Sequence, residues 1–199
     1  MTGLTQRSGQ RRGLRRRMAA WVTFTALVLL VPLVAMRFTD EVMWDAFDFV
    51  VMCALICGVG TAYELVAANV SASTYRAGLG VALAAAFVMI WVNGAVGLIG
   101  NEDDAVNLVF FAVLAVALIG AILARLRPDG MARALFATAL AQALVAAVAL
   151  SAGWGSEGPT WPRDILMATG FFITLWLISA VLFRTAAQRQ THDRRGAVA

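Results

Sequence analysis

The sequence predicts an all-α polytopic membrane protein in which six transmembrane helices form a compact bundle with both termini in the cytoplasm. Two observations predict this class. The chain has 199 residues, of which 61% are hydrophobic, compared with about 45–50% in a typical soluble domain. The apolar residues are also concentrated in six blocks of about 20 residues, each long enough as a helix to cross a hydrocarbon core roughly 30 Å thick.

The predicted spans cover residues 18–36, 46–68, 77–99, 106–126, 131–151 and 165–183. Lipid offers the backbone no hydrogen-bond partner, so each span must be helical. The first apolar run is longer than that of a typical signal peptide, and no A-x-A cleavage site follows it, so we expect a retained helix. The chain then divides into a basic cytoplasmic tail at 1–17, a six-helix transmembrane domain at 18–184 and a cytoplasmic C-terminal tail at 185–199.

The connections between the spans alternate in charge, and this alternation predicts the orientation. Arginines dominate the N-terminal tail, the connection near residue 127 and the C-terminal tail, whereas carboxylates dominate the connections near residues 45, 103 and 160. Arginine is retained on the cytoplasmic side, so an N-in, C-in topology follows. All 16 basic residues are arginine, and together with the many alanines this indicates a GC-rich bacterial genome and hence the bacterial inner (plasma) membrane. The topology explains the net charge of +4, so we expect no nucleic-acid partner.

Four polar residues within the predicted spans are candidate functional groups, because polar and charged side chains are costly inside a membrane. They are Asp48, Glu64, Asn93 and Gln142. Asp48 lies at the outer start of its helix, where capping is the favoured interpretation. Glu64 lies about a turn from the inner end, where a buried partner and an interfacial carboxylate both remain open.

The two amides are expected to join helices. Asn93 is predicted to form a hydrogen bond with another helix. Gln142 lies in the middle of an alanine-rich span, and such helices usually pack against neighbours, so an interhelical hydrogen bond is favoured over a substrate-binding amide. We predict that Glu64 and Gln142 face the interior of the bundle, because a polar group facing lipid would lack partners.

An outer acidic cluster, made of Glu102, Asp103 and Asp104, follows the glycine-rich end of the third span. The glycines there allow close backbone approach or loosen the helix end. A site where cations enter and a surface where a partner docks are two functional interpretations of the cluster. A hydrated loop that caps the next helix is the favoured alternative.

The sequence gives little support for a metal site or an enzyme. Cys53 and Cys57 share one helical face, which could suit Cu(I), but two small apolar residues at a helix contact are the favoured interpretation. The single histidine, His192, lies in the C-terminal tail. No P-loop, HExxH or GxSxG motif is present. We therefore expect no bound haem or metal, no other cofactor, no catalytic residues and no enzymatic activity.

Two stretches, DFVVMCALICGVGTAYEL at Asp48–Leu65 and the segment Trp91–Ala147, resemble an uncharacterised family of small multi-spanning bacterial inner-membrane proteins. The resemblance implies an integral membrane protein and assigns no activity. The favoured hypothesis is a non-catalytic accessory or scaffold protein that contacts the lipid bilayer. Its protein partner would be either a second copy of the same chain, in a homo-oligomer, or another membrane protein. The alternative is a small transporter or channel, in which the four polar residues line one path for a cation or small solute.

Overall fold

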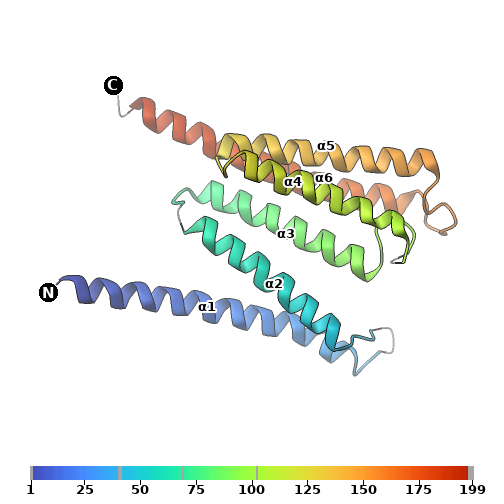
Figure 1. The fold of residues 1–199 in the computed structure, drawn as a ribbon, viewed down its shortest axis with the longest axis horizontal. Coiled ribbons are helices and arrows are strands. Elements are labelled where there is room, and N and C mark those ends of the chain that lie inside the picture. Colours follow the sequence, from blue (N-terminus) through green and yellow to red (C-terminus); the bar gives the residue numbers. More distant parts are fainter. Residues whose placement is uncertain (1, 40–41, 69, 102, 197–199) are drawn as a thin grey trace. The chain divides into compact units, whose positions relative to one another are not determined.

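The computed structural model describes residues 2–39, 42–68, 70–101 and 103–196, and their side chains between Arg17 and His192. The described residues form helices joined by turns and contain no strand (Figure 1). Six of these helices are long and apolar enough to cross a membrane. The predicted all-α polytopic class with six spans is therefore confirmed.

Contacts between residues divide the chain into two units, Met1–Glu64 and Leu65–Ala199. Unit 1 contains α1 (Thr2–Ala35) and most of α2 (Ala46–Ala67). The helix α1 begins inside the segment that the sequence assigned to the basic tail, so this segment and the first span form one continuous helix. Close approach of α1 and α2 depends on Gly60, because a Cβ there would lie 2.9 Å from the Trp21 ring.

Unit 2 contains α3 (Ser73–Ala95), the short 3₁₀ helix η1 (Ala105–Leu108), α4 (Val109–Leu123), α5 (Pro128–Ala152) and α6 (Arg163–Gly196). The third span therefore lies about one turn earlier than residues 77–99, which the sequence predicted. Gly97 and Gly100 have φ angles of 72° and 71°. This left-handed conformation suits glycine and ends the helix before them.

Glycines bring α4 and α5 together at one end of unit 2. A Cβ on Gly120 would lie 2.6 Å from the Cβ of Ala134, and a Cβ on Gly130 would lie 2.6 Å from that of Ala124. The order of these two contacts shows that the helices are antiparallel. Small residues of this kind let membrane helices approach closely and gain dispersion contacts.

A polar and aromatic contact joins α6 to α3. The hydroxyl of Ser179 donates a hydrogen bond of 2.7 Å to the carbonyl oxygen of Gly78. The rings of Tyr75 and Phe183 meet edge to face at 4.8 Å. Tyr75 also donates a hydrogen bond of 2.6 Å to the carbonyl oxygen of Leu126, which ties α3 to the turn between α4 and α5.

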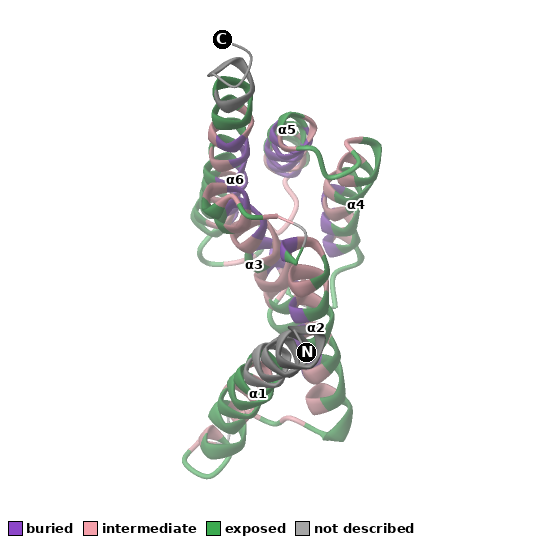
Figure 2. Ribbon diagram, turned by 90° about the vertical axis from the view of Figure 1, so that its left-hand side faces the viewer, coloured by how far each residue is buried: buried purple, intermediate pink, exposed green. Residues whose placement is uncertain are grey.

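Burial follows these contacts. Figure 2 shows buried residues along α5 and α6, while exposed residues cover much of the outer helix surfaces. The largest fully buried side chains of unit 2 include Trp176, Phe172, Phe183 and Met89. Many large apolar side chains remain exposed on the spans, which fits contact with a lipid bilayer.

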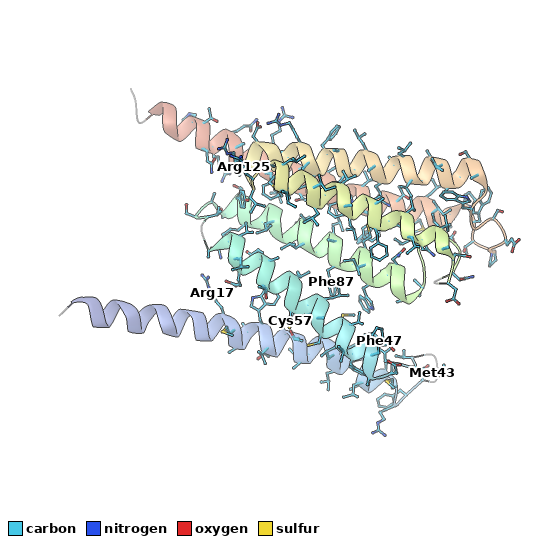
Figure 3. All side chains as sticks on the ribbon, viewed as in Figure 1. Arg17, Met43, Phe47, Cys57, Phe87 and Arg125 are labelled. Carbon is cyan, nitrogen blue, oxygen red and sulfur yellow. The ribbon has the colours of Figure 1, made fainter. Side chains whose placement is uncertain are left out.

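The charged residues of unit 2 lie mainly at its two ends. The arginine end is defined by Arg76, Arg125, Arg127, Arg133 and Arg184 (Figure 3 labels Arg125). The carboxylate end is defined by Asp103, Asp104, Glu157 and Asp164, together with Arg163. The arginine end holds the starts of α3 and α5 and the last residues of α4, and the carboxylate end holds the start of α6.

Candidate functional site

Asp48 takes part in capping α2. Asp45 accepts hydrogen bonds from the backbone N–H groups of Phe47 and Asp48, at 2.7 and 3.0 Å. In return, the Asp48 carboxylate accepts a hydrogen bond of 2.9 Å from the backbone N–H of Asp45. Trp44 and Phe49, on either side of this pair, meet edge to face. This is a capping box with a hydrophobic staple. The Asp48 carboxylate therefore stabilises the N-terminus of α2.

Glu64 is held by two residues of α1. One carboxylate oxygen lies 3.2 Å from Nη1 of Arg17, and the other accepts a hydrogen bond of 3.3 Å from Nε1 of Trp21. The side chains of Arg17 and Glu64 are 51% and 31% exposed. Glu64 therefore has partners on a neighbouring helix, but its side chain is not fully buried. Figure 3 shows Arg17 on the side of α1 that faces α2.

Asn107 organises the turn between α3 and η1. Its Oδ1 accepts hydrogen bonds from the backbone N–H groups of Leu98 and Ile99, at 3.0 and 2.9 Å. Its Nδ2 donates to the carbonyl oxygens of Ile99 and Asn101, at 3.0 and 2.7 Å. Asn107 is only 3% exposed. Its amide therefore provides the hydrogen bonds that water would otherwise provide to four backbone groups of the turn.

Asn93 belongs to the same cluster. Its Nδ2 donates a hydrogen bond of 3.2 Å to the carbonyl oxygen of Asn107. The predicted contact of Asn93 with another element is therefore present. Its partner is the 3₁₀ helix η1, which immediately precedes α4. The Oδ1 of Asn93 is buried without a hydrogen-bond partner among the described residues.

The outer acidic cluster is only partly described, because Glu102 lies outside the described residues. Asp104 accepts a hydrogen bond of 3.0 Å from the backbone N–H of Asn101. The backbone N–H of Asp103 donates to Oδ1 of Asn101, at 3.0 Å. Asp103 and Asp104 are exposed. These bonds within the cluster fit the loop part of the interpretation. The capping part is wrong for Asp104, which stands at the start of η1 but makes no side-chain capping bond to that helix.

Gln142 lies inside unit 2, with 1% of its surface exposed. This placement is the one predicted from the alanine-rich span. The expected interhelical hydrogen bond does not involve its carbonyl oxygen, because Oε1 has no partner among the described residues. Trp176 on α6 is similarly buried, and its Nε1 also has no partner in the described part of the chain.

Cys53 and Cys57 are free thiols on α2. Cys53 is half-buried and Cys57 is exposed. Figure 3 labels Cys57 on α2. Over the described ranges, no group of three or more His, Cys, Asp or Glu residues is arranged to hold a metal ion. The expectation that the protein binds no metal or haem stays a prediction.

Three of the four predicted residues are bonded within separate local structures. Asp48 and Glu64 lie near opposite ends of α2, each with its own partners. Asn93 lies in the last turn of α3, while Gln142 lies in the middle of α5. Asn107 was not among the candidate residues predicted from the sequence. The signal that could have found it is an asparagine that follows a turn containing Gly97 and Gly100, whose backbone groups need partners.

Comparison of the chain with protein-family models, with curated proteins and with solved structures gave no match. This result is consistent with the uncharacterised family that the sequence resembles. The class of protein therefore follows from the helices themselves, which suggest a multi-pass integral membrane protein.

Proposed function

We propose that this chain is a non-catalytic accessory or scaffold protein of the bacterial inner membrane, with both termini in the cytoplasm. The observation that supports this proposal best is the separate local bonding of three of the four candidate polar residues. Asp48 caps α2, Glu64 bonds to α1 and Asn93 bonds to η1. These three polar groups stabilise helices and turns. Stable helices are required of a protein that acts by contacting other helices.

The uncovered face of α1 supports a partner in the membrane. Phe24, Leu27, Val31 and Val34 follow one another at spacings of three and four residues, and all four are exposed. This spacing places them on one side of the helix, and no residue of the membrane-spanning part of α1 is buried. Such a stripe suits either lipid or a second transmembrane helix.

Photo-crosslinking would test the accessory role. A photoreactive phenylalanine analogue at Val31, which is 69% exposed, should give one discrete protein adduct in native membranes. The same analogue at Leu118 of α4, also exposed, is the matched control and should give lipid adducts. Lipid adducts alone at both positions would contradict a partner on α1.

The proposed orientation has its own test. Reporter fusions at Asn101 and at Ala199 should report opposite sides of the membrane, with Asn101 outside and Ala199 in the cytoplasm. The physical reason is the retention of arginine-rich segments on the cytoplasmic side. A cytoplasmic Asn101 or an external Ala199 would show that the orientation is wrong.

A transporter or channel for a cation or small solute is the second candidate. The observation that favours it is the presence in unit 2 of two buried amide oxygens, on Asn93 and Gln142, without donors among the described residues. Such oxygens are suitable ligands for hard cations. Under the accessory proposal, proteoliposomes containing the protein should take up Na⁺, K⁺ or Mg²⁺ no faster than empty liposomes.

Gln142→Leu separates the two candidates. Interhelical hydrogen bonds in membranes average about 0.6 kcal/mol, and the Gln142 carbonyl oxygen has no partner among the described residues. The variant should therefore unfold in detergent within about 1 kcal/mol of the parent. Gln142→Met, which keeps a similar volume, controls for packing. Cation uptake by the parent that disappears in both variants, while both still fold, would favour the transporter over the accessory role.

A further inference from the structure

A cleft of about 880 Å³ opens at the arginine end of unit 2. The first residues of α5 form one side of it, and the last turns of α6 form the other. None of the four candidate polar residues lines it. Its lining residues are Arg127, Pro128 and Asp129, with Arg184, Ala187, Gln188, Gln190, Thr191 and His192.

The cleft has an excess of positive charge. Arg127 and Arg184 are among its lining residues, and Asp129 is the one carboxylate among them. That carboxylate is already paired, since its Oδ2 lies 3.1 Å from Nη2 of Arg133. Among the described side chains, neither Arg127 nor Arg184 forms an ion pair with a carboxylate. Two guanidinium groups are thus left to attract an anion.

The donors of the cleft suit a phosphate group. A guanidinium group offers several N–H donors in a planar fork that matches two phosphate oxygens. Gln188 also lines the cleft, and its amide adds an uncharged donor. The hydroxyl of Thr191 already donates to the carbonyl oxygen of Ala187. The α5 helix begins here without a side-chain cap, so its positive dipole end strengthens the attraction.

The position of the cleft favours a phosphate carried by a lipid. The apolar sequence of α6 gives way to polar residues at Arg184. Val181 lies three residues before Arg184 on the same helix and is 62% exposed, so apolar surface for an acyl chain continues from the polar cleft. Basic pockets between transmembrane helices at a membrane boundary are suited to acidic lipid headgroups.

We propose that this cleft binds the phosphate headgroup of an acidic glycerophospholipid. Arg127 and Arg184 contact the phosphate oxygens, and the acyl chains lie along the exposed apolar surface of α6 that includes Val181. The proposal concerns unit 2 alone and does not depend on whether the protein is an accessory subunit or a transporter.

The test compares lipids on the purified full-length protein by native mass spectrometry. Phosphatidylglycerol should remain bound about tenfold more tightly than phosphatidylcholine. Both lipids carry a phosphate, but the choline ammonium makes the phosphatidylcholine headgroup net neutral and is repelled by the two guanidinium groups. The double variant Arg127→Gln, Arg184→Gln should lose this preference. The double variant Arg37→Gln, Arg163→Gln removes the same charge at positions outside the cleft and should keep it.

Two results would overturn the proposal. Equal loss of the preference in both double variants would show that net charge, not the cleft, attracts the lipid. Inorganic phosphate that displaces phosphatidylglycerol at equal concentration would show a site for a free anion, without a contribution from the acyl chains. Circular dichroism of each variant in detergent should give a helix content equal to that of the parent. Loss of lipid binding then results from the change in the cleft and not from unfolding.

Discussion

Asn107→Leu should destabilise the protein more than any other substitution considered, by about 3–5 kcal/mol, because it leaves several buried backbone groups without partners at once. The side chain of Asn107 forms four hydrogen bonds with the backbone between Leu98 and Asn101. Leucine has a similar volume but neither donor nor acceptor. The turn would have to open to water or leave its N–H and C=O groups unsatisfied.

The free energy of unfolding in detergent, followed by circular dichroism, measures the effect of this change. Hydrogen exchange at the amides of Leu98 and Ile99 should become faster, because both donate to Asn107 Oδ1. Asn107→Asp keeps the acceptor and loses the donors, so it should fall between the parent and the leucine variant. Asp103→Asn, at an exposed position of the same turn, should change little. Unchanged stability of Asn107→Leu would show that the turn does not depend on this side chain.

Gly120→Ala should also destabilise unit 2, by about 1–3 kcal/mol, the range for overfilling a packed contact. The added Cβ would lie 2.6 Å from the Cβ of Ala134 and 3.3 Å from its Cα. Neither atom is the end of a flexible side chain, so α4 and α5 must move apart.

Gly170→Ala is the matched control for this helix contact. Gly170 lies in the interior of α6, and a Cβ there would meet nothing within 4 Å. In this open position, alanine should be neutral or stabilise the helix by up to about 1 kcal/mol. The two variants thus differ in the sign of the expected effect. Ala134→Gly should partly restore stability to Gly120→Ala, and a double-mutant cycle measures that coupling. Equal effects of the two alanine substitutions would contradict the close contact.

The helical class was predictable because the bilayer imposes a simple rule on sequence. A membrane-crossing helix needs about 20 mainly apolar residues, and six such blocks can be identified in the sequence. Helix ends were harder to predict. The apolar residues continue through Leu98 and Ile99, but α3 stops at Ala95, because Gly97 and Gly100 take the left-handed conformation. Hydropathy alone does not report this backbone conformation.

The sequence predicted where the candidate residues lie better than it predicted which groups they bond to. The small residues around Gln142 indicated a packed helix, which agrees with its burial. The bonds of Asn107 depend on how the turn folds back, and no periodic pattern encodes this. The partners of Glu64 are Arg17 and Trp21, which are 47 and 43 residues away. All three lie towards the arginine-flanked ends of consecutive predicted spans, so the topology placed them at a similar depth without specifying the bonds.

The contacts of unit 2 imply an order in which its parts can assemble during synthesis. The bonds of Asn107 join residues no more than 14 positions apart, so this turn can close soon after α4 begins to leave the ribosome. The bond from Ser179 to Gly78 joins residues 101 positions apart and must wait for the last helix. Until α6 arrives, the face of α3 that carries Tyr75 and Gly78 lacks its final neighbour. Assembly of unit 2 is therefore complete only after α6 has been synthesised.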